Sequence, residues 1–285
     1  MTHLLAVGLG YSAERVAKRL ASEGWRITGS SRSINGAERI RRCGYDAVAF
    51  DGTARSADLE QAIASATHLL VSAAPDAHGD PLLRWHADDI ARSSSLTWIG
   101  YLSTVGVYGD HGGAWVDETT PPAPISERGQ RRVEAERAWL ALDSARRAVQ
   151  VFRLAGIYGP GQNQVEAVRR GEARRIIKPG QVFNRIHVDD IAGAVIAGLR
   201  TPSARGVFNI ADDLPAPPED VIVYAASLLG IAPPPAVPFA EAEMTPMARS
   251  FYSEVKRVAN VRAKRELGWT LSYPTYREGL AAYAR

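Results

Sequence analysis

The feature that most constrains the fold of this chain is a glycine-rich turn between a short strand and a helix. The stretch His3–Val7 reads as a strand, and it runs directly into Gly8-Leu-Gly10-Tyr-Ser-Ala13 and then a helical stretch. The pattern G-x-G-x-x-A in this strand–turn–helix context indicates a dinucleotide-binding βαβ unit. Gly8 permits the tight turn, Gly10 lets the backbone approach a pyrophosphate, and Ala13 allows the helix to pack closely on the strand. The residues predicted to contact a cofactor here are Gly8, Gly10, Tyr11, Ser12 and Ala13.

Short β-rich runs alternate with helical stretches up to about residue 155, which is the pattern of repeated βαβ units. Several runs are apolar on both faces, so the predicted fold is α/β with a Rossmann-type, doubly wound parallel sheet. Later Gly- and Pro-rich loops indicate a small C-terminal substrate lobe. We predict a dinucleotide-binding domain at 1–156 with returning segments at about 187–210, and a substrate lobe at 157–186 and 211–285. The predicted strands are His3–Val7, Trp25–Ser30, Ala47–Phe50, His68–Ser72, Leu96–Leu102 and Val149–Leu154.

The residues after the second predicted strand favour NADP(H) over NAD(H). An NAD-specific site places a carboxylate there to accept from the ribose 2′-hydroxyl, but this chain reads Thr28-Gly-Ser-Ser-Arg-Ser33. Hydroxyls and a guanidinium suit a 2′-phosphate, so Ser31 and Arg32 are predicted to bind it, with NAD(H) as the alternative cofactor. Asp51-Gly52, after the third strand, is expected near the adenine. Ala73-Ala74-Pro75, after the fourth, is expected near the nicotinamide ribose.

Composition excludes several other classes of function. A net charge of +3 over 285 residues is too small for an electrostatic nucleic-acid footprint. The longest apolar run, Ile191–Leu199, is too short for a membrane span, and the N-terminus lacks the basic region of a signal peptide. The single Cys43 excludes an internal disulfide, and the six histidines show no metal-ligand spacing; His78 and His86 are expected at the surface. We therefore expect a cytoplasmic protein with a small-molecule substrate, no nucleic-acid or membrane partner and no metal.

Five further motifs follow one another along nearly the whole chain. They are Leu102-Ser-Thr-Val-Gly-Val-Tyr-Gly109, Phe152-Arg-Leu-Ala-Gly-Ile-Tyr-Gly-Pro-Gly161, Arg185-Ile-His-Val-Asp-Asp190, Gly206-Val-Phe-Asn-Ile210 and Leu267-Gly-Trp269. In this order, and after the glycine-rich turn, they resemble the short-chain dehydrogenase/reductases, specifically the extended, epimerase/dehydratase-like branch and its atypical members. The resemblance implies a nicotinamide cofactor lying across the strand ends beside a C-terminal substrate lobe.

The chain departs from this family at the acid–base residues, which are a Ser or Thr after the fifth strand and a Tyr-x-x-x-Lys on the next helix. Thr104 matches the hydroxyl, with Ser103 beside it. Aligning Glu136 with the usual Glu of the helix places Arg128 at the tyrosine and Arg132 at the lysine. A guanidinium holds its protons and cannot replace the tyrosine as a general base. By resemblance, Arg132 could still bind the nicotinamide ribose, and Arg128 could bind a substrate carboxylate or phosphate.

Other groups near these motifs are weaker candidates. Tyr108, Asn184 and His187 are candidates for substrate contacts, and an imidazole titrates closest to neutral pH. Each also has a structural interpretation: Tyr108 as a packed lid aromatic, His187 as a hydrogen-bonding residue before a helix, and Asp189 as that helix's N-cap.

Two hypotheses from different classes follow. The first is an NADP(H)-binding, atypical SDR-type oxidoreductase or epimerase-like enzyme for a small polar or sugar-like substrate, with Ser103, Thr104, Arg128 and Arg132 at its centre. The second is a catalytically silent dinucleotide-binding or redox-sensing protein. Dimers of the family often form through the helices that here span about 81–92 and 126–142. Because the second of these is rich in Arg and Glu, a monomer and a homodimer are both open.

Overall fold

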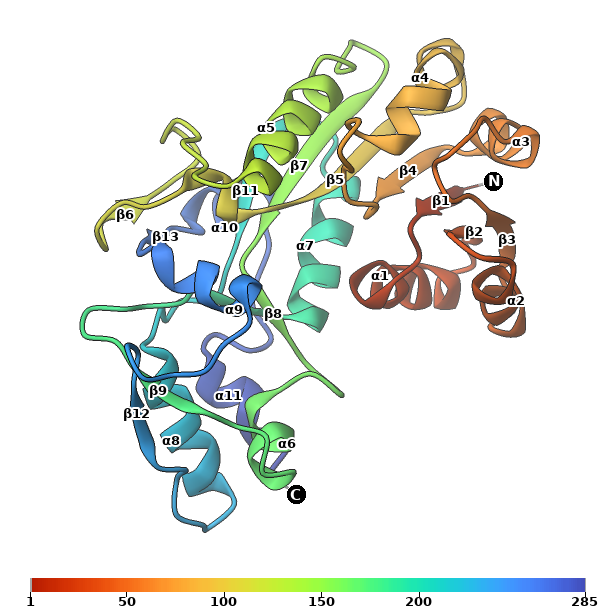
Figure 1. The fold of residues 1–285 in the computed structure, drawn as a ribbon. Coiled ribbons are helices and arrows are strands. Elements are labelled where there is room, and N and C mark those ends of the chain that lie inside the picture. Colours follow the sequence, from red (N-terminus) through yellow and green to blue (C-terminus); the bar gives the residue numbers. More distant parts are fainter. Residues whose placement is uncertain (1, 285) are drawn as a thin grey trace.

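A parallel sheet of seven strands forms the centre of the computed structural model, which describes residues 2–284 (Figure 1). The strands are β1 (His3–Val7), β2 (Arg26–Ser31), β3 (Asp46–Ala49), β4 (His68–Val71), β5 (Trp98–Thr104), β7 (Ala148–Leu154) and β11 (Gly206–Ile210). Their order in the sheet is β11-β7-β5-β4-β1-β2-β3, and every neighbouring pair is parallel. The order reverses between β1 and β4. In such sheets ligands bind beyond the carboxyl ends of the strands at this reversal.

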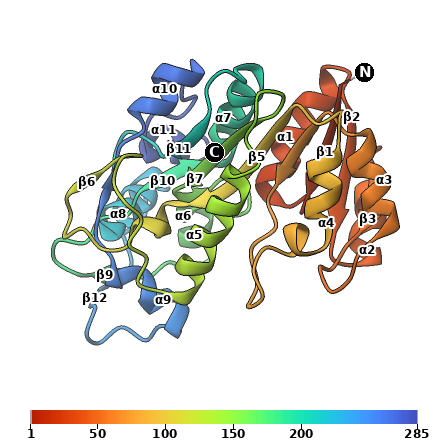
Figure 2. The same ribbon diagram turned by 90° about the horizontal axis from the view of Figure 1, so that it is seen from above.

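Helices cover both faces of the sheet (Figure 2). The helices α1 (Tyr11–Ser22) and α7 (Val188–Arg200) pack together on one face, and α2 (Ile34–Arg42) packs beside β2 and β3. The other face carries α3 (Ala57–Ser65), α4 (Pro81–Arg92) and α5 (Glu127–Leu140). Every residue of β1 and β7 is buried, because both faces of a doubly wound sheet are covered. The predicted α/β class and doubly wound parallel sheet are confirmed.

Most of the remaining elements lie at the carboxyl side of the sheet and carry three small two-stranded ladders, whereas α10 (Val261–Leu267) packs against α7 and β11. These pair β8 (Gly156–Tyr158) with β10 (Arg185–His187), β9 (Arg175–Ile177) with β12 (Ala236–Pro238), and β6 (Trp115–Val116) with β13 (Arg257–Val258). The helices here are η1 (Val105–Tyr108), α6 (Gln164–Arg169), α8 (Pro218–Leu228), α9 (Pro246–Ser250), η2 (Phe251–Ser253) and α11 (Tyr276–Ala281). Their own apolar cluster includes Tyr158, Val165, Val221, Ala225 and Leu280. The division into domains predicted above stays a prediction.

Local details differ from the sequence predictions. The six predicted strands all form: His3–Val7 has the predicted bounds, and the ends of the others shift by at most two residues, as for β5, which runs to Thr104. His78 is exposed as expected, but the surface position predicted for His86 is wrong, because its side chain is completely buried. Its Nδ1 lies 2.8 Å from Asp89 Oδ2, and its Nε2 accepts from the Ser56 N–H at 3.2 Å. The burial of His86 is tolerated because both ring nitrogens find partners.

No helix within residues 2–284 is long and apolar enough to cross a membrane. The same residues hold no group of three or more His, Cys, Asp or Glu side chains arranged to bind a metal ion.

Candidate dinucleotide site

The turn between β1 and α1 contains two glycines, so no side chains cover its backbone at these positions. Gly8 has φ +84°, and a Cβ atom there would lie 3.0 Å from the Ala73 nitrogen, so only glycine fits between β1 and the end of β4. Its N–H donates to the buried Ser30 hydroxyl at 2.9 Å. Gly10 precedes the helix without a side-chain cap, and a Cβ there would meet nothing closer than Gly8 O at 4.0 Å. The free N–H groups of the first turn therefore face open space, which suits a pyrophosphate.

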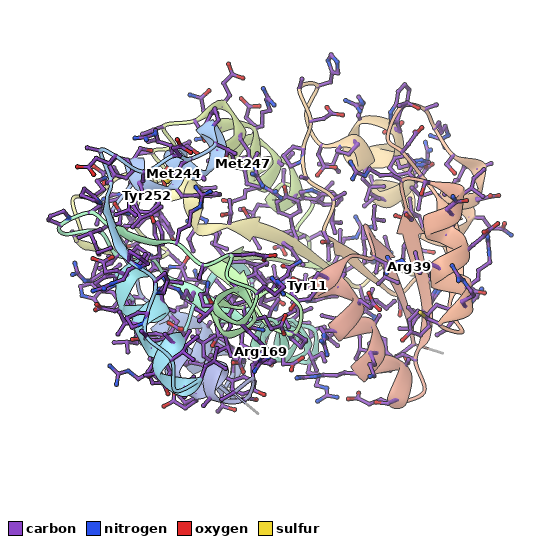
Figure 3. All side chains as sticks on the ribbon, turned by 60° about the horizontal axis from the view of Figure 1, so that its bottom comes forward. Tyr11, Arg39, Arg169, Met244, Met247 and Tyr252 are labelled. Carbon is purple, nitrogen blue, oxygen red and sulfur yellow. The ribbon has the colours of Figure 1, made fainter. Side chains whose placement is uncertain are left out.

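The other predicted cofactor contacts in the first turn differ in exposure. Ser12 and Ala13 are buried against the sheet, so they can offer only their backbone N–H groups. Tyr11 is half-buried, and its hydroxyl donates to the carbonyl of Pro160 at 2.9 Å. Figure 3 shows Tyr11 where α1 meets the elements that follow β7. The turn therefore contacts residues 149 positions away in the chain.

The carboxyl ends of β2, β3 and β4 bring the remaining predicted cofactor residues to the same edge of the sheet. Ser31 is half-buried and Arg32 is exposed; within residues 2–284 the Arg32 guanidinium makes no hydrogen bond or ion pair. Asp51 is exposed, and hydrogen bonds from the Thr53 N–H and hydroxyl, at 2.8 and 2.7 Å, lower the pKa of its carboxyl. Gly52 is buried against α4, while Ala73 and Pro75 are half-buried and Ala74 is exposed.

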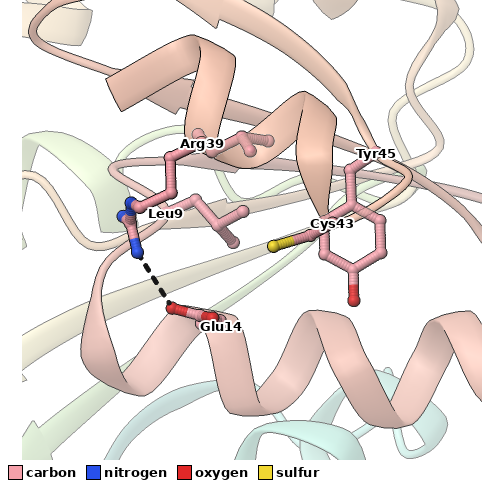
Figure 4. A pocket seen from close by; sticks show the side chains of 6 residues that line it. Leu9, Glu14, Arg39, Cys43 and Tyr45 are labelled. Carbon is pink, nitrogen blue, oxygen red and sulfur yellow. Dashed lines mark ion pairs between the residues drawn. The ribbon is translucent and has the colours of Figure 1, made fainter. Parts of the chain in front are cut away.

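A very small pocket lies behind this turn, between α1 and α2 (Figure 4). Its volume of about 10 Å³ holds no more than one water, so it is not the adenine site. Arg39 and Glu14 form an ion pair of 3.5 Å across it, and the exposed Cys43 lies at its edge. A second cavity, of 330 Å³, lies beyond β11 and is lined by Trp115, Asp212, Asp213, Val258, Ala259, Asn260 and Val261. None of the predicted site residues lines either pocket.

The hydroxyls at the end of β5 have different roles. Thr104 Oγ1 accepts from the Gly106 N–H at 3.1 Å, which leaves its own proton free to be donated elsewhere. Thr104 is half-buried. Ser103 is buried and donates to a carboxylate oxygen of Glu136. Of the two, only Thr104 can therefore reach a bound substrate.

Ser103 belongs to a buried polar row that the sequence did not predict. It is directly opposite Arg153 on β7, and Arg153 is directly opposite Asn209 on β11. The Arg153 guanidinium contacts the Glu136 carboxylate at 2.7, 3.1 and 3.2 Å, and both side chains are at least 95% buried. Tyr108 stacks on the Arg153 guanidinium at 4.7 Å and donates to Asn209 Oδ1 at 2.8 Å. This row fixes α5 and η1 against three neighbouring strands.

Arg128 and Arg132, which stand at the family's tyrosine and lysine positions, differ in burial. Arg132 is buried, and its Nη1 donates to Tyr101 Oη and to Leu102 O, both at 3.0 Å. Arg128, one helical turn earlier, is exposed. The first turn of α5 lies beside η1, because a Cβ on Gly129 would be 3.7 Å from Gly106 O. Arg128 and Thr104 are thus carried by neighbouring turns of the chain.

The three weaker substrate candidates are all buried in the fold. Tyr108 belongs to the row just described, and burial raises the pKa of its phenol. Asn184 donates to Lys256 O at 3.0 Å and accepts from the Val258 N–H at 2.8 Å. His187 is fully buried, caps α7 and lies 2.6 Å from Tyr283 Oη; burial lowers its pKa to about 4. None of these three side chains is exposed.

The N-cap predicted at Asp189 is wrong. The cap is His187, whose Nδ1 accepts from the Asp189 N–H at 3.1 Å. Asp189 lies inside the first turn, 3.7 Å from Arg15. Asp190 instead accepts from the N–H groups of Ser272 and Tyr273, which joins α7 to the C-terminal segment.

Comparison with known proteins agrees with this geometry. The model of the NAD dependent epimerase/dehydratase family matches residues 7–211. This chain belongs to that family. The match spans the glycine turn, the β5 end and the strand β11, and it places the chain among dinucleotide-binding proteins of the short-chain dehydrogenase/reductase type.

Three similar proteins illustrate the range of the family. A solved conserved protein of unknown function from Silicibacter pomeroyi is 51% identical, with a TM-score of 0.89, over 100% of this chain and 98% of its own. The protein YeeZ of Escherichia coli K12 is 30% identical over 82% of this chain and 86% of its own. The human epimerase family protein SDR39U1, solved with NADPH, shares the fold at 18% identity and a TM-score of 0.78, over 99% of both chains.

Proposed function

We propose that this chain binds NADP(H) in preference to NAD(H) and acts as an oxidoreductase on a small polar carbonyl or sugar-like compound. The observation that carries the cofactor proposal is the combination of a bare backbone at Gly10 with a free Arg32 at the end of β2. The family's description names a dinucleotide, and the solved SDR39U1 contains NADPH, which supports the same cofactor class here.

The residues present suit the dinucleotide along its whole length. The N–H groups of Tyr11, Ser12 and Ala13 at the start of α1 would bind the pyrophosphate. Ser31 and Arg32 would bind the 2′-phosphate, because no carboxylate stands at the end of β2 to repel it. When bound, NADPH supplies a hydride at its nicotinamide ring. Asp51 and Ala73, at the ends of β3 and β4, would border the adenine and the nicotinamide ribose.

The cofactor proposal is tested by calorimetric titration of NADP⁺ and NAD⁺ into the native protein and into Arg32→Ala. A charge-assisted contact to phosphate contributes about 1.5–3 kcal/mol, so Arg32→Ala should weaken NADP⁺ binding by roughly tenfold or more and leave NAD⁺ binding unchanged. Arg42→Ala is the matched control, because Arg42 is also exposed but is the last residue of α2, whose first turn follows β2. Equal affinities of the native protein for the two cofactors would rule out the proposed preference.

A second candidate is a dinucleotide-binding protein without turnover. The observation that favours it is the inward direction of Arg132, whose Nη1 is bound to Tyr101 and Leu102. Oxidation of NADPH with small aldehydes and ketones, and reduction of NADP⁺ with sugar alcohols, separates the candidates. Tight cofactor binding without turnover of any compound would favour the second.

A further inference from the structure

We infer that Arg128 and Thr104 together hold the oxygen atom of a carbonyl substrate and stabilise the negative charge that develops on it. This inference rests on the proposed oxidoreductase function. It names the substrate class as compounds with a reducible C=O group. It also gives the arginine at the family's tyrosine position a role other than proton transfer.

Arg128 differs from the other arginines near it. Arg131 pairs with Glu127 at 2.7 Å, Arg132 is buried on Leu102, and Arg153 is held by Glu136. Within residues 2–284, Arg128 is exposed and forms no ion pair and no hydrogen bond. A guanidinium without a protein partner is free to bind an anionic oxygen.

The backbone around Arg128 places it beside Thr104. Gly129 packs on the turn that follows β5, where its Cβ position is 3.7 Å from Gly106 O and 2.6 Å from the Pro124 side chain. A side chain at 129 would clash with Pro124. The Gly106 N–H in turn binds Thr104 Oγ1 at 3.1 Å. The backbone segments that carry Arg128 and Thr104 therefore lie next to each other.

The direction of the Thr104 proton follows from its hydrogen bond. Because Oγ1 accepts from the Gly106 N–H, the hydroxyl proton points away from that turn and is available as a donor. The neighbouring Ser103 cannot compete for the same oxygen, since its proton is given to Glu136. Thr104 thus offers one neutral donor and Arg128 one charged donor.

The free N–H groups at the start of α5 add to the positive electrostatic potential of the Arg128 guanidinium. Ser126 caps this helix by accepting from the Gly129 N–H at 3.1 Å, and Arg128 lies in the first turn, at the positive end of the helix. Donors fixed in advance around a developing oxyanion are among the strongest catalytic devices in enzymes.

The proposed reduction of the carbonyl group needs no acidic side chain of the protein to supply the proton. As the carbonyl carbon accepts a hydride, the π electron pair moves to the oxygen, which becomes an alkoxide held by Arg128 and Thr104. A water molecule then protonates the alkoxide, and the buffer neutralises the hydroxide that remains. Overall, a hydride and a proton add across the C=O bond. A guanidinium, which holds its protons, suits the role of a fixed counter-charge rather than a proton donor.

The test uses a matched pair of probes, 4-nitrobenzaldehyde as the carbonyl compound and 4-nitrobenzoate as its anionic analogue. The variant is Arg128→Gln, and the control is Arg131→Gln, three positions along the same helix. Titrations of 4-nitrobenzoate, with and without NADP⁺, should show binding about tenfold weaker in Arg128→Gln and unchanged in Arg131→Gln. The kcat for 4-nitrobenzaldehyde with NADPH should fall roughly 100-fold in Arg128→Gln alone. Added guanidinium chloride at millimolar concentration should restore part of it.

The affinity for NADPH, followed by its fluorescence, separates this inference from the proposed function. If the native protein does not bind NADPH, the proposed function fails, while the 4-nitrobenzoate titration still tests Arg128. If NADPH binds normally and Arg128→Gln behaves like Arg131→Gln in both assays, the inference is overturned and the proposed function stands. Absence of both binding and turnover of the probes in the native protein also overturns the inference.

Discussion

The buried pair of Glu136 and Arg153 offers the sharpest test of what holds α5 on the sheet. Glu136→Gln keeps the size of the side chain but removes its charge, so Arg153 is left buried without a counter-ion. Three contacts of 2.7–3.2 Å are weakened, and the Ser103 hydroxyl loses a charged acceptor. Arg153 Nη1 already lacks a partner, so no alternative protein group is positioned to compensate.

The magnitude follows from the burial of the pair, whose side chains are 3% and 5% exposed. Removing one partner of a buried ion pair costs about 3–5 kcal/mol. At about 2 °C per kcal/mol for a chain of this size, the melting midpoint should fall by roughly 6–10 °C. Glu127→Gln is the control on the same helix, because Glu127 is 82% exposed in its pair with Arg131. That pair contributes at most about 0.5 kcal/mol.

The assay is unfolding in urea and by heat, followed by circular dichroism, for the native protein and both variants. A third variant, Glu136→Met with Arg153→Met, removes both charges and should recover most of the loss, because a buried pair replaced by apolar groups is often neutral. If Glu136→Gln costs less than about 1 kcal/mol, or no more than Glu127→Gln, the pair does not contribute as its burial indicates.

Three other changes have expected outcomes. Gly10→Val should abolish cofactor binding in calorimetry while the circular-dichroism melt stays native, because its Cβ would enter open space and not the core; retained binding would contradict the proposed pyrophosphate position. Burial lowers the pKa of His187 to about 4, so the unfolded chain binds more protons below pH 6.5 and stability falls on acidification. His187→Asn should reduce the loss of unfolding free energy between pH 7 and pH 5 by about 2 kcal/mol. An unchanged dependence of this free energy on pH would refute the prediction. Burial raises the pKa of Asp212 to about 7, so folded Asp212 keeps a proton and stability falls as pH rises toward 7. Asp212→Asn should gain about 1 kcal/mol relative to the native protein between pH 6 and pH 8, measured by urea unfolding, and no gain would contradict this assignment.

Local patterns predicted the fold because their causes are local. The glycine turn needs only a positive φ at Gly8 and free space at Gly10, and both requirements can be read from a strand, two glycines and a helix. The parallel sheet followed from runs that are largely apolar on both faces, such as β1 and β4. Strand ends moved by a residue or two because pairing, and not composition, decides where a strand stops.

The missed features depend on register between distant segments. Ser103, Arg153 and Asn209 become neighbours only when β5, β7 and β11 align, which no single stretch of sequence specifies. One signal was available, since an Arg within a mostly apolar strand favours a buried carboxylate as its partner, and Glu136 lies one turn after Arg132 on α5. The contact of Tyr11 with Pro160 joins residues 149 positions apart and has no such signal.

The place of β11 in the sheet has a consequence for synthesis of the chain. The strand β7 ends at Leu154, and the strand that covers its outer edge, β11, is complete only at Ile210. At about 5–20 residues per second, a ribosome needs roughly 3–11 s to make the intervening segment. During that interval the apolar sequence of β7 presents an unpaired edge to other nascent chains. Chaperone demand and misassembly during translation should therefore be concentrated in this window and relieved once residues 206–210 have emerged.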